Sequence, residues 1–422
     1  MKLQKILKRI QKLHPKEIDL SLNRVKKLCK KLGNPQEYLK CISIVGTNGK
    51  YSTIQALRAI FKQASINCNI YTSPHLQKIN ERFVFNDREI SDQKLSQLLN
   101  EVEEINNGDS ITYFEILTAA FFYNAKKFNK NINLIESGLF HRFDATNILT
   151  KNLASIVTSI GLDHLDWLPK NQRSIKKIII EKTSSLLNSK IIISKQNSKE
   201  TLNIIKKNIL KNNSKKIIFN EHFTCSENEN GFIYYEDKFG GLKLPKPNIL
   251  GEFQIDNIAS AIATARSLNL KIQDQNIKHG ITKIKSIGRL QEIKNGKIKN
   301  LCKNNKLFVD GSHNPLGAKA LKKYLKSLNC RKHIILGMML NKDHLEYMNY
   351  FKDDVDTITT IDIKNQKNSI KGYDLKNKLE GFNNITYKKN IKEAIGSLNL
   401  KKNDIILVTG SLYLVGEVLS LN

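Results

Sequence analysis

The stretch Val45-Gly46-Thr47-Asn48-Gly49-Lys50-Tyr51-Ser52-Thr53 indicates how the first half of the chain folds. It follows an apolar strand expected at residues 41–45 and opens a helix expected at residues 52–64. Its two glycines let backbone N–H groups face an anion, the helix N-terminus adds positive potential, and Lys50 adds a full charge. The stretch therefore predicts a phosphate-binding loop whose hydroxyl groups could reach Mg²⁺, although its glycines are closer together than in the common phosphate loop. The alternative is an ordinary strand-to-helix turn.

Apolar strands alternate with helices around this loop, which favours a parallel, doubly wound sheet. The strands expected in this first series cover residues 41–45, 69–72, 133–136, 155–159 and 190–194, and the helices cover 52–64, 111–128 and 255–268. Residues 221–247 differ, because Tyr and Phe alternate with polar residues between glycines; this pattern predicts small hairpins.

A second series of strands begins near residue 306. Its strands are expected at residues 306–310, 333–337, 357–362 and 404–409, with a helix at 317–328. The boundary between the two series is expected within residues 283–288, which predicts domains 1–286 and 287–422. Residues 1–15 are basic, but their leucines and isoleucines recur at helical spacing, so we expect an amphipathic first helix rather than a targeting peptide.

The chain is strongly basic: 69 Lys and Arg residues stand against 39 Asp and Glu residues, a formal net charge of +30. Such a charge is typical of proteins that bind a polyanion such as nucleic acid. The alternative is compositional drift, because Lys, Asn and Ile are abundant and all have A/T-rich codons. The basic residues are spread along the whole chain without a stripe or interleaved aromatic residues, which favours drift and predicts no nucleic-acid partner.

Length, apolar content and cysteine spacing exclude several classes of protein. With 422 residues, 40% of them hydrophobic, the chain can form two or three domains and cannot be globally disordered. No apolar run approaches the roughly 18–20 residues that span a bilayer, so we expect no membrane association. The 6 cysteines form no Cys-x-x-Cys pair, which argues against a disulfide framework and predicts a cytoplasmic location.

Three further loops follow strand ends, where ligands bind in open α/β sheets. Glu136 ends the strand at 133–136, His164 follows the strand at 155–159, and residues 310–315 follow the first strand of the second series. Glu136 and His164 are candidate ligands of a hard cation. The alternatives are an ion-pair partner for Glu136, a helix-capping role for His164 and a turn with an N-cap for residues 310–315.

Many short segments, in one order along nearly the whole chain, together resemble the folylpolyglutamate synthase family of Mur-ligase-like amide ligases. The likeness is closest to the bifunctional dihydrofolate synthase/folylpolyglutamate synthases. The segments are residues 13–15, 18–20, Arg24, 45–50, 71–76, 80–82, 112–115, 144–147, 158–164, 181–182, Gln254, Asn257, 288–290, 310–315, 337–338 and 410–413. The resemblance implies an α/β fold with a P-loop, Mur-ligase-like parallel-sheet ATPase domain and a smaller, Rossmann-like C-terminal domain.

The resemblance also implies a reaction in two steps. ATP phosphorylates a substrate carboxylate, and the amine of L-glutamate then attacks the acyl phosphate. The acceptors of glutamate are dihydropteroate and the γ-carboxylate of a folate. The implied cofactors are ATP and Mg²⁺, with K⁺ as a further candidate, and the implied state is a monomer.

Site residues follow from the resemblance position by position. The ATP contacts are Thr47, Asn48, Gly49, Lys50, Ser52, Asn257, Arg289 and Asp310, and the magnesium ligands are Ser73, Glu136 and His164. The pteroate-binding residues are Ile18, Asp19, Leu20, Thr112, Tyr113, Phe114, Glu115, Arg142, Phe143 and Asp144. The residues expected to act in catalysis are Lys50, His164, Lys182 and His313, and Lys182 matches a lysine that is carbamylated in the family.

The chain departs from the family pattern in and near this site. Tyr51 stands where the folate ligases usually have Gly, and Phe140-His141 replaces a Gly-Gly pair. Thr183-Ser184 replaces Ala-Gly, and Phe253 replaces His. We expect Phe140 and His141 to crowd the metal and pteroate sites and to narrow the range of substrates. Two alternatives are a peptidoglycan Mur ligase and a decayed, non-catalytic member that binds nucleotide or nucleic acid.

Overall fold

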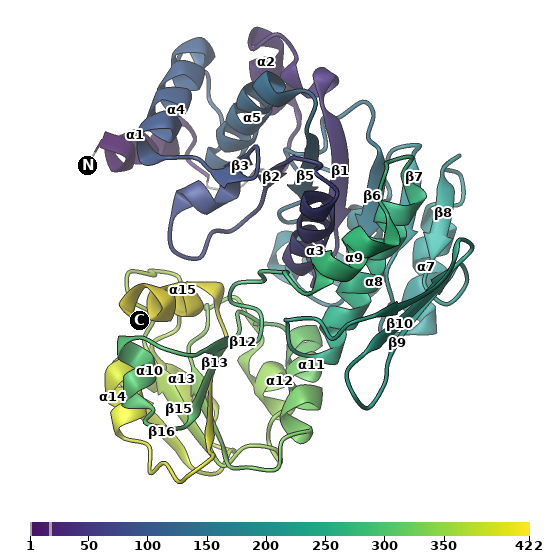
Figure 1. Ribbon diagram of the computed structural model, residues 1–422. Coiled ribbons are helices and arrows are strands. Elements are labelled where there is room, and N and C mark those ends of the chain that lie inside the picture. The colour runs from purple at the N-terminus through teal and green to yellow at the C-terminus, as the bar shows by residue number, and fades with distance from the viewer. Residues whose placement is uncertain (1, 17–18) are drawn as a thin grey trace. The chain divides into compact units, whose positions relative to one another are not determined.

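The computed structural model describes residues 2–16 and 19–422 (Figure 1). The chain divides into two compact units. Unit 1 comprises the described residues up to Ile160, together with Asn171–Pro247 and Asp256–Ile284. Unit 2 comprises Gly161–Lys170, Asn248–Ile255 and Lys285–Asn422. The two short segments of unit 2 come from the predicted first domain, and the boundary between residues 286 and 287 stays a prediction.

Unit 1 contains an 8-stranded sheet in the order β4-β3-β2-β5-β1-β6-β7-β8. Its strands are β1 (Lys40–Val45), β2 (Cys68–Tyr71), β3 (Phe83–Phe85), β4 (Arg88–Glu89), β5 (Ile132–Glu136), β6 (Ala154–Val157), β7 (Lys190–Ile193) and β8 (Lys215–Ile218). All pairs from β2 to β8 are parallel, as the alternating pattern predicts. The short strands β3 and β4 add an antiparallel edge that was not predicted.

Helices cover this sheet, and a small antiparallel sheet follows it in the chain. The helices are α1 (Lys2–Ile10), α2 (Asn23–Lys31), α3 (Lys50–Gln63), α4 (Asp92–Asn106), α5 (Tyr113–Ala125), α6 (Ile175–Thr183), α7 (Lys199–Asn208), α8 (Glu252–Ser267) and α9 (Asp274–Ile281). Short 3₁₀ helices of unit 1 cover Gln11–Leu13, Pro35–Tyr38, Ile79–Arg82 and Lys126–Phe128, whereas Leu165–Trp167 belongs to the unit 2 segment Gly161–Lys170 and Lys170–Gln172 begins at the last residue of that segment. The hairpins predicted at 221–247 are the strands β9 (Phe223–Glu227), β10 (Ile233–Asp237) and β11 (Gly240–Leu244). Figure 1 shows α3 and α9 side by side.

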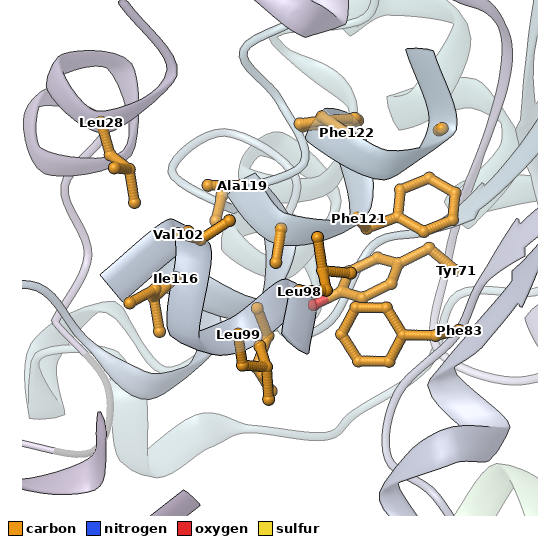
Figure 2. Close-up of a cluster of buried hydrophobic side chains, with 14 of the residues drawn as sticks. Leu28, Tyr71, Phe83, Leu98, Leu99, Val102, Ile116, Ala119, Phe121 and Phe122 are labelled. Atoms are coloured by element: carbon orange, nitrogen blue, oxygen red, sulfur yellow. The ribbon is translucent and has the colours of Figure 1, made fainter. Parts of the chain in front are cut away.

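A hydrophobic core of unit 1 lies among α1, α2, α4 and α5, and Figure 2 shows part of it. The predicted amphipathic first helix is confirmed: Leu3, Ile6, Leu7 and Ile10 are all buried. Tyr71, on β2, stacks on Phe121 of α5 at a centroid distance of 5.0 Å. This core fixes the position of β2, whose end leads into the segment that carries Ser73.

Unit 2 contains a 6-stranded sheet in the order β12-β13-β17-β14-β15-β16. Its strands are β12 (Gln291–Ile293), β13 (Lys306–Val309), β14 (Lys332–Leu336), β15 (Thr357–Ile361), β16 (Ile385–Lys388) and β17 (Ile405–Thr409). Only β12 is antiparallel to its neighbour among these described strands. The helices are α10 (Lys297–Leu301), α11 (Pro315–Lys326), α12 (His344–Asn349), α13 (Gly372–Lys378), α14 (Ile391–Gly396) and α15 (Leu412–Leu421).

These two α/β units have the predicted fold class. Across the described residues, no helix is both long enough and apolar enough to span a bilayer. The 6 cysteines are all free.

Candidate functional site

The predicted phosphate loop joins β1 to α3, and its backbone conformation requires glycine. Gly46 has φ 146° and Gly49 has φ 91°. A Cβ on Gly46 would lie 2.0 Å from Thr158 Oγ1, and a Cβ on Gly49 would lie 2.3 Å from Asn257 Oδ1. Glycine is therefore needed at both positions for two reasons: a side chain would clash with a neighbouring residue, and other residues rarely adopt these φ values. Asn257, a predicted ATP contact on α8, lies against the loop.

The loop is tied to its neighbours in the sheet. The N–H groups of Thr47 and Asn48 both donate to the carbonyl oxygen of Ser159, over 3.0 and 3.1 Å. Lys50, the first residue of α3, donates from Nζ to the carbonyl oxygens of Gly46 (3.2 Å) and Thr47 (3.1 Å). The lysine is thus folded over its own loop, with its charge held at the end of β1.

Glu136 ends β5, the strand next to β1, and its carboxylate is buried. Its Oε2 accepts the N–H of Ser73 over 3.2 Å, and its Oε1 lies 3.8 Å from Nζ of Lys50. The structure therefore brings together two predicted magnesium ligands and the predicted phosphate lysine. The oxygen atoms of Ser73 and Glu136 suit a hard cation such as Mg²⁺. Among the described residues, no three His, Cys, Asp or Glu side chains are grouped so that they could hold a metal ion.

Arg24 connects several predicted pteroate-binding residues. Its Nη1 donates to Asp19 Oδ2 over 2.7 Å, and its Nε donates to Glu115 Oε2 over 2.9 Å. Glu115 also accepts the N–H of Thr112 over 2.8 Å, and the Thr112 hydroxyl accepts the N–H of Glu115, so these two residues cap α5 reciprocally. In this structure Thr112 and Glu115 serve the helix N-terminus. Leu20 follows in the same segment, and Ile18 lies outside the described residues.

Asp144 organises the loop after β5 from a buried position. It accepts the N–H of Gly138 (2.8 Å) and both the N–H (3.0 Å) and the hydroxyl (2.5 Å) of Thr146. Burial raises the pKa of Asp144, although these hydrogen bonds oppose the rise. The Phe114 ring lies close to Gly138, since a Cβ there would be 3.3 Å from its Cζ.

Arg142, a predicted residue of the same loop, contacts α6. Arg142 pairs with Glu181 over 3.4 Å, and its guanidinium carbon lies 4.8 Å from the ring centroid of Phe143. Tyr113 is the first residue of α5 and is partly buried against the core of unit 1.

The unusual pair Phe140-His141 is buried around Lys182. Nζ of Lys182 donates to the carbonyl oxygens of Leu139 (2.7 Å) and Gly46 (3.0 Å), and it lies 5.5 Å from the ring centroid of Phe140. Nδ1 of His141 lies 3.0 Å from the Ser137 hydroxyl. Burial, with a smaller effect of the Lys182 charge, lowers the pKa of His141 to about 4. Lys182 therefore links the phosphate loop to the loop after β5.

In unit 2, Asp310 follows β13 and fixes the turn around Arg289. Its carboxylate accepts the N–H groups of Leu290 (2.7 Å) and Ser312 (2.8 Å). Burial raises the pKa of Asp310, and the Arg289 charge opposes this rise. Arg289 Nη1 donates to the carbonyl oxygen of Gly288 over 3.3 Å.

His164 and His313, both in unit 2, lie near the carboxylate of Asp163, a residue for which the sequence predicted no role. Nε2 of His313 lies 3.5 Å and Nε2 of His164 lies 3.8 Å from Asp163 Oδ2. Lys342 donates from Nζ to Asp163 Oδ1 over 2.6 Å. Sequence reasoning missed Asp163 and Lys342, because no spacing links residues so far apart; the only signal was that Asp163 lies inside a segment that carries the family resemblance.

Comparison with known proteins gives matches over the whole chain. Residues 288–412 match the Mur ligase, glutamate ligase domain. The chain is 27% identical over 419 residues to the dihydrofolate synthase/folylpolyglutamate synthase of Bacillus subtilis, covering 94% of each chain. It is also 27% identical over 417 residues to that of Escherichia coli, covering 97% of this chain and 93% of the relative.

Solved structures match equally completely. Escherichia coli FolC in complex with DHPP and ADP has a TM-score of 0.87 and 26% identity, covering 99% of this chain and 97% of that chain. Mycobacterium tuberculosis folylpolyglutamate synthase complexed with ADP and AMPPCP has a TM-score of 0.88 over 100% of this chain and 98% of that chain; at 20% identity it supports the fold alone. The chain is therefore similar over nearly its whole length to dihydrofolate synthase/folylpolyglutamate synthases, and its residues 288–412 match the Mur ligase, glutamate ligase domain.

Proposed function

We propose that this chain is an ATP-dependent ligase that adds L-glutamate to dihydropteroate, to the γ-carboxylate of a tetrahydrofolate, or to both. The observation that carries the proposal is the cluster of Lys50, Glu136 and Ser73 at the ends of neighbouring strands, beside a glycine loop. The full-length similarity to dihydrofolate synthase/folylpolyglutamate synthases supports the choice of substrates.

The proposed reaction joins anionic reactants, so charge has to be neutralised where phosphate and carboxylate meet. A carboxylate oxygen of the acceptor attacks the γ-phosphorus of ATP, which forms an acyl phosphate and releases ADP. The amine of glutamate then attacks the acyl carbon, loses a proton and expels inorganic phosphate. Lys50 stabilises charge on the transferred phosphoryl group, since its ammonium lies at the loop.

A divalent cation fits the oxygen atoms of Ser73 and Glu136, and when bound it would neutralise charge on the phosphates. His164 as a further ligand, and Thr47, Asn48, Ser52, Asn257, Arg289 and Asp310 as ATP contacts, remain proposals from the resemblance. The same holds for the pteroate segments around Asp19, Thr112 and Arg142.

K⁺, carbamylation of Lys182, a monomeric state and a cytoplasmic location are further predictions from the sequence. Carbamylation would turn an ammonium into a carboxylate-like group. In the structure Nζ of Lys182 donates to two carbonyl oxygens. A ¹³C NMR spectrum of the protein in ¹³C-bicarbonate tests the modification directly.

The decisive experiment measures phosphate release from ATP with L-glutamate and either dihydropteroate or tetrahydrofolate. We expect release with at least one acceptor and none without glutamate. Release with a UDP-linked muropeptide precursor instead would favour the peptidoglycan ligase. No turnover, together with salt-dependent retention of nucleic acid on a filter, would favour a decayed binding protein.

A further inference from the structure

Asp163 contacts side chains from two other loops of unit 2. It lies in the segment Gly161–Lys170, which follows β6 in the chain but packs with unit 2. Its carboxylate is buried and receives Lys342 Nζ at Oδ1 (2.6 Å) and Asn314 Nδ2 at Oδ2 (3.0 Å). His313 Nε2 lies 3.5 Å from the same Oδ2.

The partners of Asp163 come from separate strand ends. His313 and Asn314 follow β13, whereas Lys342 follows β14, and β17 lies between these strands. A second hydrogen bond joins the loop after β14 to the segment Gly161–Lys170: Asn341 donates from Nδ2 to Asp166 Oδ2 over 3.0 Å. Asp163 therefore holds the loops of two non-adjacent strands to one point.

The same carboxylate orders His164, the next residue. His164 has φ 58°, a left-handed conformation that is strained for a residue other than glycine. Its N–H donates to Asp163 Oδ1 over 2.9 Å, and its Nε2 lies 3.8 Å from Oδ2. The orientation of His313 is fixed from both sides, since its Nδ1 lies 2.9 Å from the carbonyl oxygen of Gly311.

We propose that Asp163 is a positioning residue, which holds His313 and Lys342 in the orientation needed for glutamate ligation. Removing its charge leaves an ammonium and an imidazole without their buried counter-charge, so both side chains reorient. The catalytic half of this inference rests on the proposed function, whereas the positioning of His313 can be measured without turnover.

Unit 2 contains a matched control for this carboxylate. Asp404 is also buried, and it also pairs with a histidine and a basic residue: His333 Nε2 at 3.1 Å and Arg331 Nη1 at 3.5 Å. This cluster lies at the opposite ends of the strands, because His333 is near the start of β14 and Asp404 directly precedes β17. Asp163→Asn and Asp404→Asn therefore make the same chemical change at opposite ends of the strands of one sheet.

The first measurement is labelling of His313 with diethyl pyrocarbonate, quantified by peptide mass spectrometry on the full chain. In Asp163→Asn we expect the labelling rate of His313 to rise several-fold, since the imidazole loses its buried partner. Asp404→Asn should leave that rate unchanged. Equal rates in Asp163→Asn and the unmodified protein would overturn the proposal.

The second measurement is steady-state kinetics with glutamate as the varied substrate. We expect Asp163→Asn to lower kcat/KM by roughly 10–100-fold, and Asp404→Asn by less than about threefold. Lys342→Met should lower kcat/KM as well, and the double variant Asp163→Asn/Lys342→Met should lose less than the sum of the two effects. Additive losses, or losses equal to those of Asp404→Asn, would contradict a positioning role.

Two outcomes separate this inference from the proposed function. If the unmodified protein ligates no glutamate, the proposed function fails, and His313 labelling still decides whether Asp163 positions the histidine. If Asp163→Asn does not fold, Lys342→Met tests the other half of the pair. An unchanged kcat/KM in that folded variant would overturn the inference.

Discussion

The candidate sites of the two units lie at the carboxyl ends of parallel strands but are built in different ways. In unit 1 the loop after β1 takes its shape from the backbone of Gly46 and Gly49, and Lys50 binds carbonyl oxygens of its own loop. In unit 2 the loops after β13 and β14 are held by Asp163, which comes from a distant segment. The phosphate loop of unit 1 is local in sequence, whereas the Asp163 cluster of unit 2 depends on tertiary structure.

The largest expected effect tests the local site in unit 1. Lys50→Ala should lower turnover by at least roughly 1000-fold while the protein stays folded, because the lysine serves phosphate charge and not core packing. The measurement is phosphate release beside a thermal melt. Lys62→Ala, an exposed lysine on the same helix, is the matched control. Turnover near the original rate in Lys50→Ala would show that this loop is not the phosphate site.

This difference explains how much the sequence could predict. The loop at Gly46 could be found because its glycines, its lysine and the flanking strand and helix are adjacent in the chain. Glu136 could be found because it ends an apolar strand. Asp163 and Lys342 could not be paired, since only the fold brings residues 163 and 342 together.

Thr112 and Glu115, which the resemblance assigns to pteroate binding, also fit a structural role at a helix N-terminus. Thr112-x-x-Glu115 is the pattern of a capping box, and the structure contains that box at the start of α5. The edge strands β3 and β4 are too short to show a periodicity, so they were not predicted. Local patterns therefore predicted the core strands well and their irregular edges poorly.

Gly46→Ala tests whether backbone shape is what builds the unit 1 site. A Cβ there would lie 2.0 Å from Thr158 Oγ1 and 3.2 Å from the backbone carbon of that residue, at φ 146°. We expect a loss of about 3 kcal/mol in the free energy of unfolding, measured in urea.

Gly33→Ala separates the cost of the clash from the cost of the backbone angle. Gly33 has φ 75° and a Cβ added there would meet open space, so this variant should lose only about 1 kcal/mol. Equal losses in the two variants would mean that the clash with Thr158 does not contribute to the loss in the free energy of unfolding.

Glu136→Gln should have a smaller effect, on the magnesium requirement. It keeps the volume of the side chain but removes the charge that faces Ser73 and Lys50. The magnesium concentration for half-maximal turnover should rise by roughly ten- to thirtyfold. Glu89→Gln, an exposed carboxylate on β4, should leave the titration unchanged. An unchanged titration in Glu136→Gln would assign Glu136 a structural role.

The smallest expected effect concerns the buried histidine that distinguishes this chain from the family pattern. Burial, aided by the Lys182 charge, lowers the pKa of His141 to about 4 from 6.5. Between these values the unfolded chain binds a proton that the folded chain does not, so stability rises with pH in this window. The stabilisation is complete above about pH 6.5 and is lost as the pH falls toward 4. The free energy of unfolding therefore falls as the pH falls below 6.5, and we call this part of the curve the acid limb. In His141→Asn the fall between pH 6.5 and 5 should be smaller by roughly 1–2 kcal/mol.

The measurement is the free energy of unfolding in urea at a series of pH values for the original protein, His141→Asn and His279→Asn. His75 has a pKa lowered to about 4 as well, by burial and the Arg82 charge, and it remains in all three proteins. The difference curve therefore isolates His141. His279 is exposed on α9, so its replacement should leave the acid limb unchanged.

A His141→Asn curve parallel to the original one would mean that the imidazole gains its proton without cost. The Lys182 contacts would then not depend on a neutral neighbour, and the side-chain cluster that replaces the family's two glycines would be electrostatically inert.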